Sequence, residues 1–251
     1  MVSQAPPFRA LTSALHREDL AGSFIACSIF SLWGVSLAVL LSHGTAGLGA
    51  LSLLGVLWQA FLFTGLFITA HDAMHGAVCP QNPKLNHFIG TLALLLYGFF
   101  SYQELLKKHW QHHFHPASDR DPDYHDGQHE SFIAWYLHFM RNYWSWRRFW
   151  LLPIPVVVGV LALHIPFGDL MLFWALPAIL SSLQLFYFGT FLPHQEPSQG
   201  YADRFRAQSI YRSTFWSFVT CYHFGYHHEH HEVPEAAWWQ LPEVVRQGKA
   251  D

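Results

Sequence analysis

Long apolar runs without charged residues alternate along this chain with polar segments that are rich in histidine and aromatic residues. Four such runs lie at residues 20–42, 48–70, 149–165 and 170–192. A transmembrane helix needs about 20 predominantly apolar residues, and the four runs approach or exceed that length. The pattern predicts an all-α integral membrane protein with four transmembrane helices, paired as two hairpins, and further helices in the membrane interface.

The remaining apolar stretch, residues 85–102, differs because His87, Gly90 and Gly98 interrupt it. It lies between the first two histidine-rich segments, and a single crossing would place them on opposite sides of the membrane. We therefore expect this stretch to lie in the interface or to dip in and return. The aromatic stretch at 135–150 predicts an interfacial helix, because Trp and Tyr concentrate at the headgroup level.

Composition and charge agree with this interpretation and predict an orientation. Of the 251 residues, 51% are hydrophobic and 12% are charged, whereas soluble domains are about one quarter charged. All 14 lysines and arginines fall in segments that the two hairpins place on the side of the chain ends. By the positive-inside rule this side, with every histidine-rich segment, is cytoplasmic. The net charge of −3 and the scattered basic residues give no nucleic-acid signal.

Three polar segments carry histidines at helical spacing. Residues three or four apart share one face of a helix, and imidazole is the commonest biological metal ligand. The first segment reads HDAMH, and the other two share the spacing HxxHH. Together they offer more imidazoles than one ion takes, which predicts two metal ions. The candidate ligands are His71, His75, His109, His112, His113, His227, His230 and His231.

His194, directly after the fourth apolar run, is placed to supply a ninth ligand. Asp72, Asp121 and Glu229 are candidates to accept the second ring N–H of ligating histidines, because bound imidazoles need such partners. Four further histidines are either contributors to the site or ordinary polar residues: His115, His138, His223 and His228. The isolated histidines are interpreted as interface or core residues: His16, His43, His87, His125, His129 and His164.

These segments resemble the three histidine boxes of the membrane fatty acid desaturase and hydroxylase superfamily. Within it, the chain is most similar to the bacterial-type β-carotene ketolases. The likeness is carried by HDAMHG at 71–76, KKHWQHHFHP and DRDPDY within 107–124, FYFGTFLPH at 186–194, and CYHFGYHHEHHE and PEAAWWQLPE within 221–243. It extends from about the second apolar run to Glu243 and implies a single desaturase-like domain over 1–251.

The resemblance implies a non-haem di-iron oxygenase that uses O₂ to place a keto group at C4 of the β-ionone ring of β-carotene. The products would be echinenone and canthaxanthin, on the way to astaxanthin. Zinc can replace iron in purified protein, since imidazole accepts several metals. A ferredoxin is the expected external electron donor, because no dinucleotide-binding or haem motif occurs. The location implied is a bacterial inner or cyanobacterial membrane.

Several points stay open at this stage. Phe186, Tyr187 and Phe191 are candidates to line the path of the polyene, with ordinary packing as the alternative. Whether zeaxanthin-type rings are accepted, and whether one or both rings are oxidised, is undetermined. A carotenoid hydroxylase or an acyl-lipid desaturase on the same scaffold is the main alternative, and a metal transporter or structural zinc protein is another. Lys107, Lys108, Arg147 and Arg148 are candidates for a surface that receives an acidic electron carrier, with a solvated or lipid-headgroup role as the default alternative.

Overall fold

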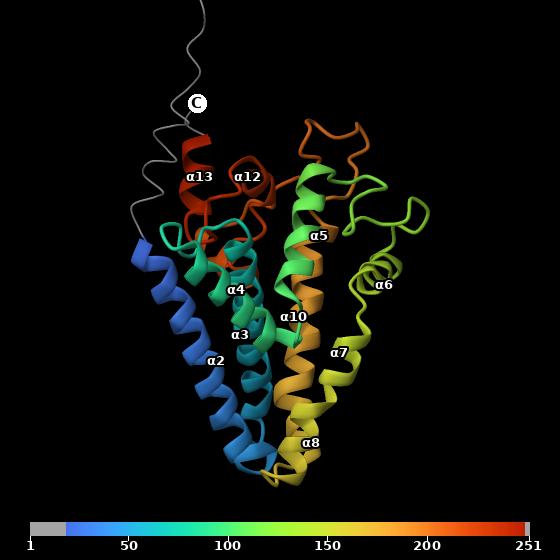
Figure 1. Ribbon diagram of the computed structural model, residues 1–251. Helices are drawn as coiled ribbons and strands as arrows, with labels where there is room; N and C mark the ends of the chain where they lie inside the picture. The colour runs from blue at the N-terminus through green and yellow to red at the C-terminus, as the bar shows by residue number, and fades with distance from the viewer. Residues whose placement is uncertain (1–18, 249–251) are drawn as a thin grey trace, which may run out of the picture.

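The computed structural model describes residues 19–248, and within this range it contains helices and no strands. An all-α membrane protein is thereby confirmed, because three segments are long and apolar enough to cross a membrane: Leu20–Leu48, Leu51–Met74 and Phe167–Phe191. Figure 1 shows the long helices meeting at one end of the molecule and spreading toward the other. His16, Arg9 and Arg17 lie outside the described residues.

Helices α2 (Asp19–Leu48) and α3 (Leu51–Met74) run side by side in opposite directions. α2 continues past residue 42, where we expected a turn, and Gly44 interrupts its regular geometry with a φ of +61°. Leu20 and Phe24 point outward from α2 and are largely exposed, as expected for a lipid-facing helix. The C-terminal half of α3 is buried and carries the first histidine segment.

The third apolar run forms two short helices, α7 (Trp146–Leu151) and α8 (Pro153–Leu161). The prediction of one continuous helix over 149–165 is therefore wrong. Pro153 and Pro155 lack the backbone N–H that would bond to the preceding turn, and so they break the hydrogen-bond ladder. The fourth run is helical throughout, as α9 (Phe167–Leu170), η1 (Met171–Ala175), α10 (Leu176–Phe186) and η2 (Tyr187–Phe191).

Helices α4 (Pro83–Gly98) and α5 (Tyr102–Phe114) are bent by 99° relative to each other. At the start of α4, the Asn86 side chain donates a hydrogen bond to the Ala73 carbonyl at 2.7 Å, so α4 begins beside the end of α3. Figure 1 shows α4 leaving this end of the molecule and α5 returning to it. This geometry agrees with a segment that dips in and returns.

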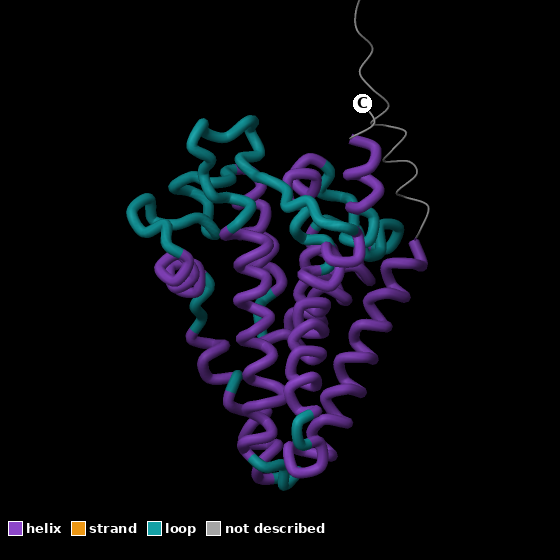
Figure 2. Tube along the Cα trace, turned by 180° about the vertical axis from the view of Figure 1, so that it is seen from behind, coloured by secondary structure: helices purple, strands orange, loops and turns teal. Residues whose placement is uncertain are grey.

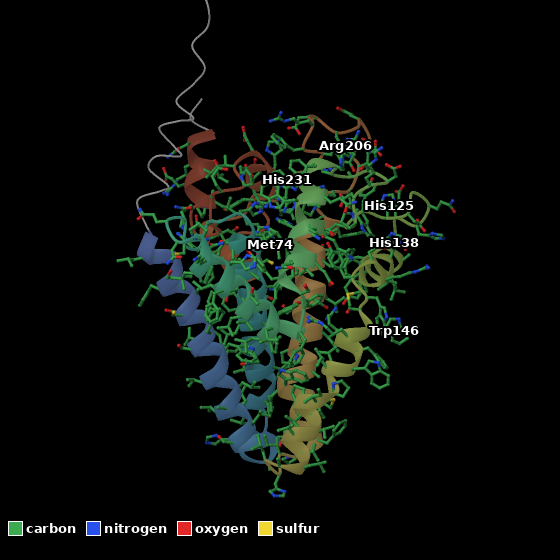
Figure 3. The ribbon with its side chains drawn as sticks, in the orientation of Figure 1. Met74, His125, His138, Trp146, Arg206 and His231 are labelled. Carbon is green, nitrogen blue, oxygen red and sulfur yellow. The ribbon has the colours of Figure 1, made fainter. Side chains whose placement is uncertain are left out.

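The aromatic stretch at 135–150 forms two helices instead of one, because α6 (Phe132–Asn142) ends before α7 begins. The aromatic side chains around α7 are at least 45% exposed: Trp144, Trp146, Phe149 and Trp150. Figure 3 shows Trp146 pointing away from the helix bundle. Such a group of exposed aromatic rings is typical of the membrane interface.

The C-terminal segment forms α11 (Thr214–Cys221), α12 (His227–Glu232) and α13 (Leu241–Gly248). Tyr222 and His223 both adopt left-handed backbone conformations, with φ of 47° and 61°. This turn reverses the chain after α11 and brings α12 toward the end of α3. Figure 2 shows that most of the loops gather at this same end of the molecule, which we call the histidine end.

Candidate metal centre

All nine candidate ligands lie together at the histidine end, where α3, α5 and α12 meet. They form two groups of four, with one histidine between them. The spacing used to select them works because each set occupies one face of its helix. His71 lies in α3 and His75 directly follows its end, α5 supplies His109, His112 and His113, the chain after η2 supplies His194, and α12 supplies His227, His230 and His231.

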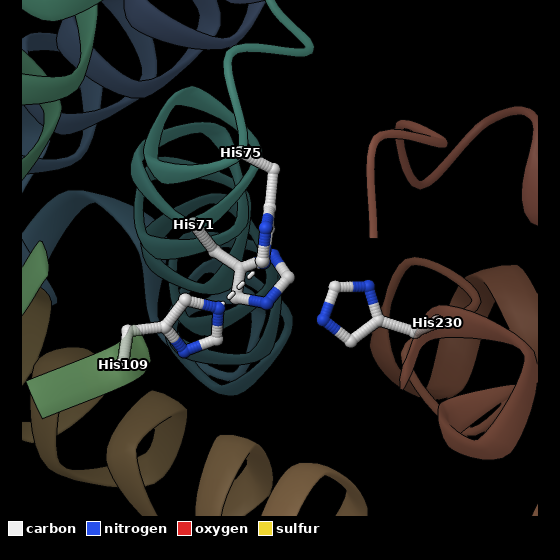
Figure 4. Close-up of side chains that lie close together, drawn as sticks. All are labelled: His71, His75, His109 and His230. Atoms are coloured by element: carbon white, nitrogen blue, oxygen red, sulfur yellow. Dashed lines mark hydrogen bonds between the residues drawn. The ribbon is translucent and has the colours of Figure 1, made fainter. Parts of the chain in front are cut away.

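The first group contains His71, His75, His109 and His230, each with a ring nitrogen within 4.8 Å of the others. Figure 4 shows these rings reaching a common centre from α3, α5 and α12. The Nε2 atoms of His75 and His109 are 2.6 Å apart. Nε2 of His71 is buried and has no hydrogen-bond partner among the described residues. A buried nitrogen without a partner is costly, and a metal ion bound by the group would satisfy it.

The second group contains His112, His194, His227 and His231, all of them buried. Neighbouring Nε2 atoms are 3.0 Å apart for His194 and His227, 3.1 Å for His112 and His231, and 3.2 Å for His227 and His231. Two nitrogens bound at right angles to one ion, at about 2.1 Å each, would be roughly 3.0 Å apart. The spacing in this group therefore fits ligands of a single ion.

His113 lies between the two groups. Its Nε2 is 3.1 Å from Nε2 of His230, and its ring stacks on the ring of His231 at a centroid distance of 4.3 Å. His113 thus contacts a member of each group and can serve either one. The nine imidazoles together supply four or five ligands for each of two ions, within the range that transition metals accept.

Three of the candidate ligands have an acceptor for the nitrogen that faces away from the centre, whereas Nδ1 of His75 and of His231 is buried without a partner among the described residues. Nδ1 of His112 donates to the Asp121 carboxylate at 2.9 Å, and Nδ1 of His194 donates to the Arg206 carbonyl at 2.8 Å. Nδ1 of His71 is 3.2 Å from the Asp72 carboxylate, which also accepts the backbone N–H of Trp238. Asp72 and Asp121 thus have the contacts expected of them. The Arg206 carbonyl could not be identified from the sequence, because every residue has a backbone carbonyl.

Glu229 has different partners from those expected. Its carboxylate accepts hydrogen bonds from the hydroxyls of Ser209 and Tyr211 instead of from an imidazole. These bonds tie α12 to the preceding loop. Glu229 therefore holds the helix that carries three candidate ligands, without orienting any of their rings directly.

The other histidines lie outside the two groups. His228 pairs with Asp203 at 2.6 Å, and the ring of His223 stacks on Tyr226 at a centroid distance of 5.8 Å. His115 is exposed after α5, and His138 is on α6. Figure 3 shows His231 deep in the helical region and His138 at the outer edge near α6. None of these four belongs to either group.

Burial favours the neutral form of most candidate ligands, whereas at His112 the Asp121 carboxylate outweighs desolvation and raises the pKa to about 9. Desolvation, followed by repulsion from His112, lowers the pKa of His194 to about 3. Desolvation also lowers the pKa of His227, His230 and His231 well below the ordinary value. A neutral imidazole keeps a lone pair for a metal. Nitrogen donors with carboxylate and carbonyl partners fit iron and equally fit zinc, copper or nickel.

An apolar cavity of about 400 Å³ ends at this centre. Its inner end is lined by histidines of both groups, namely His71, His109, His112 and His227. Its walls come from segments far apart in the chain, with Phe67 on α3, Tyr97 on α4, Phe139 on α6, and Trp174 and Ala178 along the α9–α10 segment. The cavity thus brings an apolar ligand to the space beside both metal-binding groups.

Only some of the residues that were expected to line the cavity do so, and one residue expected at the docking surface lines it as well. Phe186 lines the cavity, whereas Tyr187 and Phe191 do not, and Phe191 packs on Trp135 at a centroid distance of 5.5 Å. Arg148 also lines the cavity, with its guanidinium 3.3 Å from the centre of the Phe100 ring and its Nε donating to the Gly98 carbonyl. Arg148 is therefore partly engaged inside the molecule, and a docking surface that includes all four basic residues stays a prediction.

Comparison with known proteins agrees with this site. The sequence model of the fatty acid desaturase family matches residues 43–154 and 139–250. A β-carotene ketolase from a Paracoccus species is 41% identical over 94% of this chain and 93% of its own length. A β-carotene ketolase from a second Paracoccus strain is 43% identical over 87% of this chain and 86% of its own length.

An algal relative is similar over nearly the whole chain. The zeaxanthin 4-ketolase of Chlamydomonas reinhardtii is 39% identical over 93% of this chain and 56% of its own length. The matches span the helices that supply all three histidine segments. The chain belongs to the fatty acid desaturase family, in the branch that contains these ketolases.

Proposed function

We propose that this protein is a carotenoid ketolase that oxidises C4 of the β-ionone ring of β-carotene to a ketone. The observation that carries the proposal is the apolar cavity whose inner end is lined by histidines of both groups. The names of the Paracoccus relatives support the substrate class. The name of the algal relative supports acceptance of rings that already carry a C3 hydroxyl.

The proposed reaction is two hydroxylations at the same carbon followed by loss of water. Each hydroxylation uses one O₂, two electrons and two protons; one oxygen atom enters a C–H bond and the other leaves as water. The resulting geminal diol loses water to give the ketone. The electrons come from an external carrier, and we propose a reduced ferredoxin, since the sequence has no dinucleotide-binding or haem motif.

The nine histidines would hold two iron ions. An allylic C–H bond is inert to side-chain acid–base chemistry, so bound iron supplies the oxidising power. The chain itself positions and shields the reacting carbon. Asp121 and the Arg206 carbonyl fix the rings of two ligands, while Phe67, Met74 and Phe224 surround the inner end of the cavity and exclude water.

We also propose four membrane crossings with the histidine end in the cytoplasm. The three long helical segments supply three crossings. The bent α4–α5 pair is apolar enough for a fourth, but it would separate the first two histidine segments, so we assign the fourth crossing to the α7–α8 pair. The positive-inside rule supports the orientation. No Lys or Arg occurs in the two connections far from the histidine end, at 43–50 and 162–168, within the part of the chain that the structure describes.

The polyene would extend from the centre toward lipid between α7 and α10. Leu152 and Ile179 line this side of the cavity, and Ile179 is 55% exposed. A cavity wall that is also exposed on a lipid-facing helix offers a lateral entrance. A hydrophobic substrate dissolved in the bilayer could then enter without passing through water.

Pigment extraction from bacterial cells that accumulate β-carotene tests the function. Expression of this chain should convert β-carotene to echinenone and canthaxanthin. The His112→Ala variant should leave β-carotene unchanged, while His87→Ala, an exposed histidine outside both groups, should act like the native chain. Zeaxanthin as the product would instead assign a hydroxylase. Unchanged β-carotene with the protein in the membrane and a reductant present would refute the substrate.

A further inference from the structure

One hydroxyl in the wall of the cavity has no hydrogen-bond partner among the described residues. Thr190 is 5% exposed, lies in η2 and lines the cavity. No other group in residues 19–248 accepts a hydrogen bond from its hydroxyl or donates one to it. A hydroxyl in the wall of an apolar cavity that has no partner in the described chain is free to form a hydrogen bond with a polar group that enters the cavity.

Four other helical threonines of this chain satisfy their hydroxyls locally. Thr64, Thr69, Thr91 and Thr220 each donate to the carbonyl four residues earlier, at 2.6 to 3.1 Å. This is the ordinary arrangement for threonine in a helix. Thr190 departs from it in a π-helical turn, where Leu192 N–H bonds to the carbonyl five residues earlier. Such turns are frequent at functional sites.

The position of Thr190 is close to the inner end of the cavity. Its neighbour Gly189 lies so near Phe224 that an added Cβ would be 2.1 Å from the Phe224 ring. The Phe224 ring in turn lies 4.8 Å from the His71 ring and 5.1 Å from the His227 ring, measured between centroids. Phe224 thus lies against both this stretch of η2 and a ligand of each group.

We propose that the Thr190 hydroxyl holds the oxygen on C4 between the two hydroxylations. This inference rests on the proposed ketolase function. The β-ionone ring of β-carotene has no polar group before the first step, so apolar contacts alone position it. After O₂, two electrons and two protons have converted the CH₂ to CHOH and water, the ring carries one hydroxyl. A hydrogen bond from that hydroxyl to Thr190 fixes the ring while the second C–H bond is oxidised.

Thr190 is in this view a positioning residue, and its effect falls on the second step. Without the bond, the 4-hydroxy ring is held only by apolar contacts and leaves before oxidation more often. The net free energy of one hydrogen bond changes the ratio of release of the 4-hydroxy ring to its further oxidation by about three- to tenfold. The alcohol should therefore accumulate, with little change in the total amount of β-carotene that is oxidised.

The test compares Thr190→Val, Thr190→Ser and Thr69→Val in cells that accumulate β-carotene. Valine keeps the shape of threonine and removes the hydroxyl, and serine restores the hydroxyl. Thr69 is a matched control, because it is buried, outside the cavity, and bonded to the Gly65 carbonyl. Thr190→Val should raise the ratio of 4-hydroxy to 4-keto products about three- to tenfold. Thr190→Ser and Thr69→Val should keep the native ratio.

An unchanged product ratio in Thr190→Val, with ketone still formed, would overturn the inference and leave the ketolase function intact. Absence of any C4-oxidised product from the native chain would instead refute the ketolase function itself. A second measurement covers a poorly folding variant. Membranes containing Thr190→Val and supplied with the 4-hydroxy carotenoid should show a raised KM for that alcohol, while their KM for β-carotene stays native. Equal KM changes for both substrates would overturn the inference.

Discussion

The role of each ring at the centre depends on what binds the nitrogen that faces away from it. Asp121 accepts the Nδ1–H of His112, and the Arg206 carbonyl accepts that of His194, so both rings present Nε2 inward. Asp121 was predictable, because a carboxylate near a histidine box is an ordinary partner. The Arg206 carbonyl was not, since every residue has one. The partners of Glu229 could not be predicted, because Ser209 and Tyr211 reach it from a loop without a periodic pattern.

Replacement of Asp121 by asparagine tests the importance of that second nitrogen. The carboxylate has little exposure and also accepts the backbone N–H groups of Ala117 and Asp123. Loss of its charge should weaken metal binding or activity about 10- to 100-fold, as for other partners of ligating histidines. Iron content of the purified protein and ketone yield measure the effect. Asp126→Asn changes an exposed carboxylate away from the centre and should be silent; equal effects of both changes would argue against a specific role.

One ligand from each group should be indispensable. His230→Ala removes a candidate ligand of the first group, and His112→Ala removes one of the second. Each variant should insert into the membrane, bind less metal and form no ketone, because the chemistry requires both sets of ligands. His43→Ala, at the turn far from the histidine end, should retain both metal and activity. Ketone formation by His112→Ala would remove that residue from the ligand set.

At the scale of elements, periodicity was the informative signal. The histidine segments were recognisable because spacings of three and four residues place side chains on one helix face, and each segment is helical where its ligands lie. The break between α7 and α8 was missed because the prediction rested on the length of the apolar run, although two prolines within that run indicate a break. The bend between α4 and α5 was inferred from the position of the ligands, since hydropathy alone does not distinguish a crossing from a return.

The connection after α2 is sensitive to one side chain. Gly44 has φ +61° and ψ −179°, a conformation that is essentially restricted to glycine. A Cβ at this position would lie 2.5 Å from Oδ2 of Asp169, whose Oδ1 accepts the backbone N–H of Thr45 at 3.0 Å. Gly44→Ala should therefore lower the free energy of unfolding by about 1–3 kcal/mol, visible as a lower melting temperature in detergent.

Gly34→Ala is the control for that change. Gly34 is also in α2, but an added Cβ would have no neighbour within 4 Å. Alanine is the better helix former, so this variant should be neutral or slightly stabilised. A Gly44→Ala protein that melts like Gly34→Ala would show that the contact with Asp169 does not hold the two connections together.

At the scale of the whole molecule, the gathering of all three boxes at one end followed from a simple constraint. Ligands of one centre must lie on one side of the membrane, and that requirement predicted a returning segment between the first two boxes. The cavity did not follow from the sequence, because Phe67, Tyr97, Phe139 and Trp174 come from different helices and form no local pattern. Only Phe186 among the three expected lining residues faces it.

The cavity can be tested by filling it at a distance from the ligands. Ala178 on α10 lines the wall between the centre and the entrance, and its replacement by tryptophan would put an indole where the polyene is proposed to lie. Leu176→Trp changes a residue in the same helix that is 36% exposed and outside the cavity. Overpacking of about 1–3 kcal/mol predicts roughly a tenfold or greater loss of ketone formation for Ala178→Trp.

The metal content should stay native in both variants, since neither residue belongs to the metal-binding groups. Full activity of Ala178→Trp would exclude this cavity as the substrate path, whereas loss of metal would point to a misfolded variant and require Ala178→Leu in its place.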